Sequence, residues 1–241
     1  MTTRLEREHY LRAADVDING KWMPSAVFVR MQELAEDHAT KVGAGRIYLG
    51  ETMGLAWVLT RVYLKMYRYP CLGDTITVAT WPLKPTKLTF LRHFKMTDST
   101  GDTLGVASSQ WVLFDINDRI LRRTAIIGDY PYDPDAPTML EEPGKIKLPP
   151  DMEFKETRKV RYSDVDMNGH MNNTKYLNWI CELFPSEHLK TKRIDEIKLN
   201  YIAEPYLDQN VDLFYKEADG GWFVCGKTEE KTIFDSFVTW I

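Results

Sequence analysis

The sequence predicts an α+β protein of two tandem domains, each a curled antiparallel sheet around a long helix. Three observations predict it: an internal repeat, a proline-rich break near the middle, and a helical pattern followed by several strand patterns in each half. A helix needs its apolar stripe covered and a sheet offers one apolar face, so the two are expected to pack together. With 241 residues, 44% of them hydrophobic, the chain is long enough for two cores.

A short polar motif carries the repeat. Asp-Val-Asp, an apolar residue and Asn-Gly occupy 15–20 and again 164–169, displaced by 166 − 17 = 149 positions. Two later landmarks, a Pro-X-Leu sequence and a tryptophan, recur in the same order at displacements of 135 and 129, at Pro70 and Pro205 and at Trp111 and Trp240. The shrinking displacement indicates longer connections in the first half.

The first half begins with a helical pattern. Pro24 is a suitable first helical residue. Apolar residues then recur every three or four positions, at Phe28, Met31, Leu34, Ala35 and His38. Segments rich in β-branched and aromatic residues follow, predicting strands at about 55–68, 74–81, 87–98 and 104–116.

A linker separates the halves. Six of the twelve prolines fall between positions 131 and 150, where proline would break a helix or a central strand. The predicted domains are therefore 1–128 and 151–241, joined by a linker at 129–150.

The second half repeats the order. Asn172 or Asn173 is expected to cap a helix that Pro185 limits. Its buried stripe is predicted at Leu177, Ile180, Cys181 and Phe184. Strands are predicted at about 194–204, 210–217, 222–229 and 232–241.

Composition excludes several classes of protein. A net charge of −4 argues against general nucleic-acid binding, and no apolar run approaches the roughly 18 residues of a membrane span. The amino terminus lacks the apolar core of a signal peptide, so we expect a cytoplasmic protein. The three cysteines are odd in number and far apart, which indicates neither a disulfide framework nor a metal site, and no cofactor is expected.

The segment 161–182 combines Asp166, Asn168 and His170 with a following pair of asparagines. It resembles the active-site segment of the acyl-acyl-carrier-protein (acyl-ACP) thioesterases, and 54–61 resembles their first half. The resemblance covers nearly the whole chain. It implies tandem hotdog domains.

The resemblance also implies the catalytic residues. Asp166, Asn168 and His170 would be joined by Glu204, on the following long strand. We assign Glu204 as general base for water, Asn168 as a group holding water or substrate, His170 as a proton-handling or orienting partner, and Asp166 as the group that orients the site. Pro205 stands where some relatives have a cysteine, which closes a covalent route there.

The chemistry of thioester hydrolysis fits this segment. It needs a positioned water, a base and donors for the developing oxyanion, whereas a thiolate leaves readily because its acid has a pKa of about 8.5. The segment lies just before the predicted helix, whose amino terminus favours an oxyanion.

The repeat predicts one site per chain. Lys21 stands where the second copy has His170, and Tyr69 where it has Glu204. The first domain is therefore expected to supply the acyl-chain pocket, with Trp57 as a candidate lining residue.

Simpler interpretations remain for each residue. Asp166 and Asn168 are common turn-capping residues, and their counterparts persist in the copy without the histidine. Most strand glutamates, like Glu204, are solvated.

Other functions compete with acyl-ACP hydrolysis. An acyl-coenzyme A thioesterase would use the same residues, a dehydratase would act on 3-hydroxyacyl thioesters, and a degenerate duplication can yield a non-catalytic acyl-binding protein. Comparing turnover on the two carriers separates the two thioesterases, and a 3-hydroxyacyl thioester would show water loss rather than free thiol with a dehydratase.

The expected partner is an acyl carrier protein with its bound acyl chain, and a homodimer is left open. Residues 145–193 contain ten Lys or Arg and seven Asp or Glu, a net of +3, which suits an acidic carrier. The candidate contacts are Lys190, Lys192 and Arg193.

Overall fold

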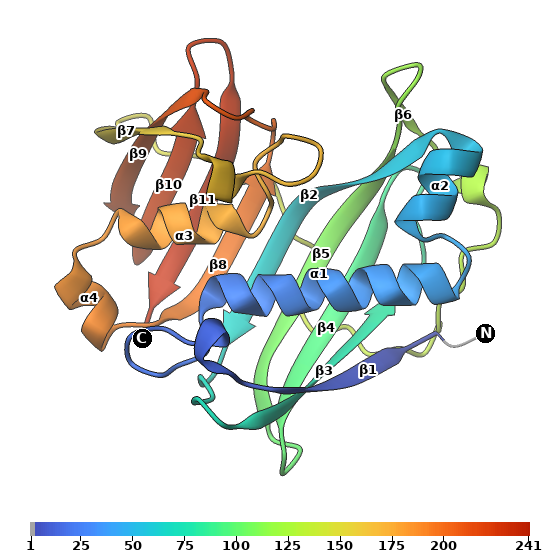
Figure 1. Ribbon diagram of the computed structural model, residues 1–241, viewed down its shortest axis with the longest axis horizontal. Coiled ribbons are helices and arrows are strands. Elements are labelled where there is room, and N and C mark those ends of the chain that lie inside the picture. The colour runs from blue at the N-terminus through green and yellow to red at the C-terminus, as the bar shows by residue number, and fades with distance from the viewer. Residues whose placement is uncertain (1–2) are drawn as a thin grey trace. The chain divides into compact units, whose positions relative to one another are not determined.

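The computed structural model describes residues 3–241 and divides the chain into two compact units (Figure 1). Unit 1 is Met1–Pro143 and unit 2 is Gly144–Ile241. The division falls inside the predicted linker. None of the helices in the described part of the chain is long and apolar enough to cross a bilayer.

Unit 1 is an antiparallel sheet with two helices. The helices are α1 (Pro24–Lys41) and α2 (Arg46–Met53). The strands are β1 (Leu5–Tyr10), β2 (Leu55–Met66), β3 (Thr75–Pro82), β4 (Phe90–Asp98), β5 (Thr103–Asp115) and β6 (Ile120–Arg122). They pair in the order β1-β3-β4-β5-β2, and β6 pairs with β5.

Helix α1 crosses one face of this sheet (Figure 1). It begins at Pro24, as predicted, because proline has no N–H to leave unpaired in the first turn. All five residues of the predicted apolar face are buried, including His38, which is 0% exposed. The hydrophobic spacing therefore places α1 correctly on the sheet.

Unit 2 has the same plan with shorter helices. Its helices are α3 (Lys175–Glu182) and α4 (Ser186–Thr191). Its strands are β7 (Glu153–Lys159), β8 (Ile194–Tyr201), β9 (Asn210–Ala218), β10 (Gly221–Lys227) and β11 (Thr232–Trp240). They pair in the order β7-β9-β10-β11-β8, again all antiparallel.

The strand register confirms the duplication. In unit 1 Arg61 of β2 lies opposite Gln110 of β5. Their counterparts in the repeat, Glu196 of β8 and Thr239 of β11, lie opposite each other in unit 2. The two pairs are related by displacements of 135 for β2 and β8 and 129 for β5 and β11, the same displacements that the Pro-X-Leu and tryptophan landmarks show in the sequence. The α+β fold of tandem helix-and-sheet units is confirmed.

Two details of the prediction are wrong. The helix of unit 2 is not long, since α3 has 8 residues against 18 in α1. It also begins later than expected, with Thr174 rather than an asparagine preceding its first residue. The side-chain oxygen of Asn172 accepts hydrogen bonds from the backbone N–H and the hydroxyl of Thr174, at 2.9 and 2.8 Å, so this asparagine forms a turn one step before the helix.

The first part of the predicted linker is fastened to unit 1. The indole N–H of Trp81 donates to the carbonyl of Pro137 (3.1 Å), and Arg61 donates to that of Pro143 (3.2 Å). Tyr130 is buried, 8% exposed. Residues 129–143 therefore belong to the packed part of unit 1.

Candidate active site

A tight turn positions His170. The carboxylate of Asp166 accepts a hydrogen bond from the backbone N–H of Asn168 (2.8 Å), and the backbone N–H of Asp166 donates to the carbonyl of His170 (2.8 Å). Gly169 has a φ of 76°, a conformation that suits glycine. These hydrogen bonds fix the position of the His170 backbone at the end of the turn.

The same turn occurs in unit 1. Asp17 accepts from the backbone N–H of Asn19 (2.8 Å), and its own N–H donates to the carbonyl of Lys21 (2.8 Å). These bonds repeat those of unit 2 at the displacement that the polar motif shows in the sequence. Turn formation therefore accounts for Asp166 and part of Asn168 without any catalytic role.

The structure brings His170 and Glu204 together. Nδ1 of His170 lies 2.6 Å from Oε2 of Glu204. A carboxylate can only accept, so the imidazole donates its Nδ1–H, and in the neutral form of the ring Nε2 is then the acceptor. Both side chains reach solvent, with 29% of His170 and 47% of Glu204 exposed, so a substrate can approach them.

Aromatic residues surround the pair. Tyr206 lies edge-on to the imidazole, with ring centroids 4.6 Å apart. Tyr176 is buried, and burial together with the charge of Glu204 raises the pKa of its phenol well above the usual range. Tyr176 therefore stays neutral. The sequence does not predict Tyr206, and its only signal there is that Cys71 occupies its place in the repeat.

The equivalent place in unit 1 holds no acid-base pair. Lys21 donates from Nζ to the carbonyl oxygen of Tyr69 (3.4 Å) and to Sγ of Cys71 (3.1 Å). The backbone of the two units matches even here, since Lys21 bridges to Cys71 as His170 bridges to Tyr206.

Two features of the predicted site differ in the structure. Strand β8 ends at Tyr201, so Glu204 lies in the connection after the strand, where Pro205 has no N–H to continue a ladder. The helix expected directly after His170 begins only at Lys175. Within residues 3–241, no three His, Cys, Asp or Glu side chains are grouped closely enough to hold a metal ion.

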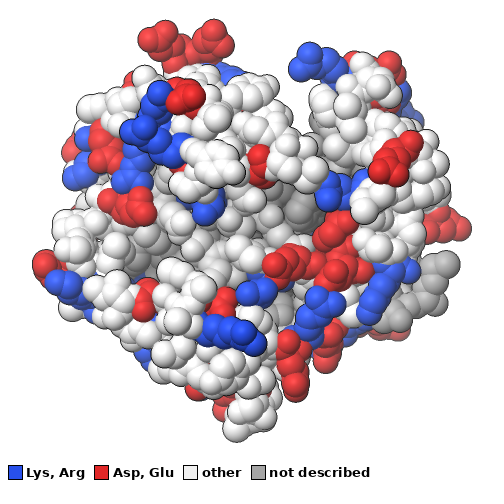
Figure 2. Space-filling view, viewed as in Figure 1, with Lys and Arg blue, Asp and Glu red and all other residues white. Residues whose placement is uncertain are grey.

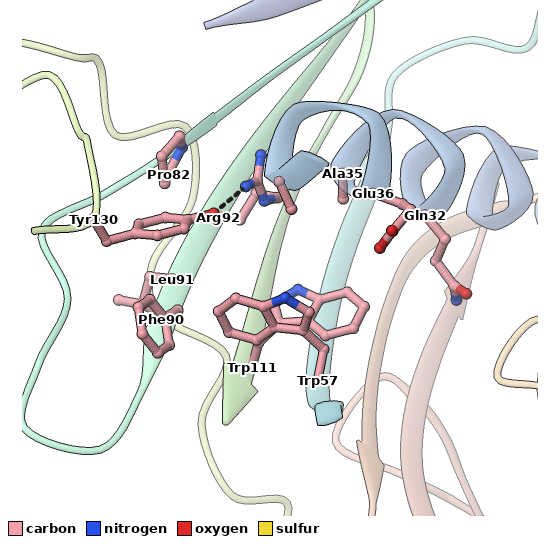
Figure 3. Close-up of a pocket in the computed structure, with 11 residues that line it drawn as sticks. Gln32, Ala35, Glu36, Trp57, Pro82, Phe90, Leu91, Arg92, Trp111 and Tyr130 are labelled. Carbon is pink, nitrogen blue, oxygen red and sulfur yellow. Dashed lines mark hydrogen bonds between the residues drawn. The ribbon is translucent and has the colours of Figure 1, made fainter. Parts of the chain in front are cut away.

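Unit 1 contains a pocket with about 440 Å³ of empty space, part of it open to solvent (Figure 3). Trp57, the candidate lining residue, borders it and donates its indole N–H to the carbonyl of Ala44 (2.8 Å). Phe90 packs edge-on against Trp57, with centroids 4.8 Å apart. The walls come mainly from α1 and from β2, β4 and β5, and most of their lining is apolar.

The candidate carrier contacts are mostly engaged within unit 2. Lys190 pairs with Glu187 (2.9 Å), and Arg193 donates to the backbone carbonyl of Leu189 (2.8 Å). On the face of the molecule shown in Figure 2, basic and acidic side chains are interspersed rather than segregated. Surface charge on that face therefore does not mark one docking area.

Comparison with protein families gives two matches. The model of the acyl-ACP thioesterase N-terminal domain matches residues 3–128, and that of the acyl-ACP thioesterase C-terminal domain matches 149–238. Together they account for most of both units.

Curated relatives match over part of their length. Oleoyl-acyl carrier protein thioesterase 2 of Arabidopsis thaliana is 28% identical over 219 residues, which are 84% of this chain and 60% of the relative. A palmitoyl-acyl carrier protein thioesterase of Cuphea hookeriana is 32% identical over 195 residues, 74% of this chain and 46% of the relative. The chain thus spans less than two thirds of the length of each of these chloroplast proteins.

Solved structures match over their full length. A crystal structure of an acyl-ACP thioesterase from Bacteroides thetaiotaomicron has a TM-score of 0.90 at 27% identity, covering 99% of this chain and 98% of that one. The 12:0-ACP thioesterase of Umbellularia californica has a TM-score of 0.80 at 22% identity, covering 100% and 98%, and supports the fold.

Proposed function

Because the chain belongs to the acyl-ACP thioesterase family, we propose that it hydrolyses fatty acyl-acyl carrier protein to a free fatty acid and the carrier thiol. The observation that carries the proposal is the 2.6 Å contact between His170 Nδ1 and Glu204 Oε2. It joins a base and its orienting group next to solvent, which is what an enzyme needs to activate water.

In the proposed reaction the His170 and Glu204 pair takes a proton from water. The water oxygen bonds to the carbonyl carbon, and the carbonyl electron pair moves onto its oxygen to give a tetrahedral oxyanion. When the oxyanion collapses, the C–S bond breaks and the thiolate leaves with its electrons. The pair then returns the proton it took from water to this thiolate, which gives the carrier thiol and restores the base. The thiolate needs little help from an acid, because thiols have a pKa of about 8.5.

The pair, rather than either residue alone, is the base in this proposal. Glu204 holds the Nδ1 proton of His170, so Nε2 carries the lone pair that can accept a proton from water. Asn168, exposed at the turn, is proposed to hold water or the substrate carbonyl. Asp166 orients both through the turn.

The carrier is the second part of the proposal. The family and its named relatives act on acyl carrier protein, which supports that carrier here. Comparing thiol release from an acyl-ACP and from the acyl-coenzyme A of the same chain tests it. Faster turnover per unit concentration on the acyl-ACP is expected. Equal or faster turnover on the coenzyme A thioester contradicts the choice of carrier, and no release from either contradicts hydrolysis.

Substitution of the pair tests the mechanism. His170→Ala and Glu204→Gln should each lower kcat on acyl-ACP by on the order of 10² to 10⁴, the usual contribution of general base catalysis. Thiol release in a continuous assay measures it. The matched control is Lys21→Ala, which removes the residue at the equivalent place of unit 1 and should leave kcat within about twofold of wild type. A Glu204→Gln protein with full activity would remove the carboxylate from the mechanism.

A further inference from the structure

The pocket of unit 1 is bordered by a buried cation, Arg92 on β4, which is 5% exposed. Its three hydrogen bonds go to neutral groups: the Thr80 hydroxyl (3.2 Å), the Tyr130 hydroxyl (2.9 Å) and Nδ1 of His38 (3.3 Å). Figure 3 shows the bond between Arg92 and Tyr130. Because a guanidinium cannot accept, His38 must present a lone pair at Nδ1.

Arg92 has no carboxylate partner in the part of the chain that the structure describes. Buried arginines are normally paired with an acid, because an isolated buried charge is costly. A guanidinium has five N–H donors, and the three contacts use three of them. Arg92 borders the pocket, so a ligand there can reach a donor that the protein leaves unused.

Helix α1 adds two further polar groups to the same pocket. Gln32 and Glu36, four residues apart, both border it (Figure 3). Oε1 of Glu36 accepts from the backbone N–H of Arg46 (3.0 Å), while its other oxygen has no hydrogen-bond donor among residues 3–241. Nε2 of Gln32 is buried without a partner in the same described range. The pocket therefore contains an unused acceptor as well as unused donors.

A plain alkyl chain does not satisfy these groups. It would exclude water from Arg92 and leave the unused donors of this buried guanidinium unpaired, which disfavours binding. A carboxylate on the chain would satisfy Arg92 but would add a second acid to a pocket that Glu36 already borders. A hydroxyl can accept from Arg92 without adding a charge to the pocket, and the chain that bears it fits the surrounding tryptophan and phenylalanine walls.

We propose that this pocket selects acyl chains that carry a neutral hydroxyl group over plain chains of the same length, with Arg92 as the residue that determines the preference. The inference rests on the proposed function only in taking the occupant to be an acyl chain. It adds a chemical preference that follows from the unpaired guanidinium.

Neutral probes test the preference without hydrolysis. Methyl octanoate and its 5-, 6-, 7- and 8-hydroxy derivatives are titrated into the wild-type protein by isothermal calorimetry. We expect one hydroxylated ester to bind on the order of tenfold more tightly than methyl octanoate, the gain typical of a hydrogen bond to a charged group. Tighter or equal binding of methyl octanoate relative to all four derivatives overturns the proposal, and this comparison needs no variant.

Substitutions then locate the preference. Arg92→Met should bind methyl octanoate at least as well as the hydroxylated esters, whereas Arg92→Lys, which keeps a cation, should retain part of the preference. Thermal unfolding checks that both are folded. A hydroxyl preference that survives in folded Arg92→Met assigns the selection to another residue and contradicts the role of Arg92.

One further variant separates the two proposals. His170→Ala should bind the probes as wild type does while its kcat on acyl-ACP falls by on the order of 10² to 10⁴. A wild-type protein that prefers the hydroxylated esters but hydrolyses no thioester refutes the proposed function alone. Hydrolysis without the preference refutes only the inference.

Discussion

Asp17 and Asp166 each accept a hydrogen bond from the backbone N–H of the asparagine two residues later, so they separate the structural role of this residue from the catalytic one proposed for Asp166. Replacing either with alanine should lower the free energy of unfolding by about 1 kcal/mol, since each substitution leaves a turn N–H without its acceptor. Only Asp166→Ala should also lower kcat, because only that turn carries His170. Urea unfolding and thiol release measure the two effects. Normal kcat in Asp166→Ala would mean that the turn orients nothing the reaction needs.

His93 predicts a loss of stability in acid. Burial lowers its pKa from 6.5 to about 4. Below pH 6.5 the unfolded chain takes up a proton that the folded protein takes up only near pH 4, so the free energy of unfolding falls across that range, by at most about 3 kcal/mol. Urea unfolding at pH 7 and pH 4.5 measures this loss.

The control for this prediction is His93→Gln. Its amide oxygen can replace Nδ1 as acceptor for the backbone N–H of Met139, which lies 3.3 Å away. Carboxylates titrate in both proteins. The difference between wild type and His93→Gln in how the free energy of unfolding changes with pH therefore gives the contribution of His93. An equal loss of the free energy of unfolding between pH 7 and pH 4.5 in the two proteins would contradict the prediction.

Among the elements, helix α2 has one glycine within it and one directly after it, and substitutions at the two should change stability in opposite directions. A Cβ at Gly50 meets no atom within 4 Å, so Gly50→Ala should raise the free energy of unfolding by about 0.5 to 1 kcal/mol, the difference in helix propensity. Gly54 ends the helix with a φ of 64°, and a Cβ there lies 2.7 Å from Nδ2 of Asn117. Gly54→Ala should therefore lower it by about 1 kcal/mol or more. Thermal unfolding of both variants tests the pair, and the same sign for both would contradict it.

The elements differ in how far the sequence predicts them. Strands with apolar residues facing the helix, such as β2 and β11, are predicted within a few residues of their observed bounds. Strands β1 and β7, with the sequences LEREHY and EFKETRK, are not predicted. They lie at the end of each sheet and are mostly exposed, so their sequences lack the alternation of apolar and polar residues that a strand with one buried face shows. Their positions follow from pairing with β3 and β9, which no local pattern encodes.

For the whole molecule, the asymmetry between the units predicts one active site per chain. A carrier protein that bears a non-hydrolysable thioether in place of the thioester should bind with a stoichiometry of one per chain, measured by calorimetry. The His170→Ala protein should show the same stoichiometry, since the variant removes a base and leaves the docking surface. Two equivalents bound per chain would mean that unit 1 keeps a working carrier site.

The candidate site is partly predictable from the chain. His170 can be singled out because its copy is Lys21, but Glu204 needs the family resemblance, since a lone glutamate after a strand carries no signal. Their contact depends on a backbone hydrogen bond from the N–H of Met171 to the carbonyl of Pro205 (3.0 Å). This bond holds the turn that carries His170 against the connection after β8 that carries Glu204. Arg92 is not predicted, because its burial depends on the assembly of β4, α1 and the linker.

The packing of Tyr130 also bears on how chimeric proteins should be joined. The match to the family model of the first domain ends at residue 128, yet Tyr130, which accepts a hydrogen bond from Arg92, lies just beyond it. If the first domains of two family members were exchanged at residue 128, Arg92 would come from one protein and the residue at position 130 from the other. A splice after Pro143 transfers the pocket wall intact, and with it whatever selectivity the donor possesses.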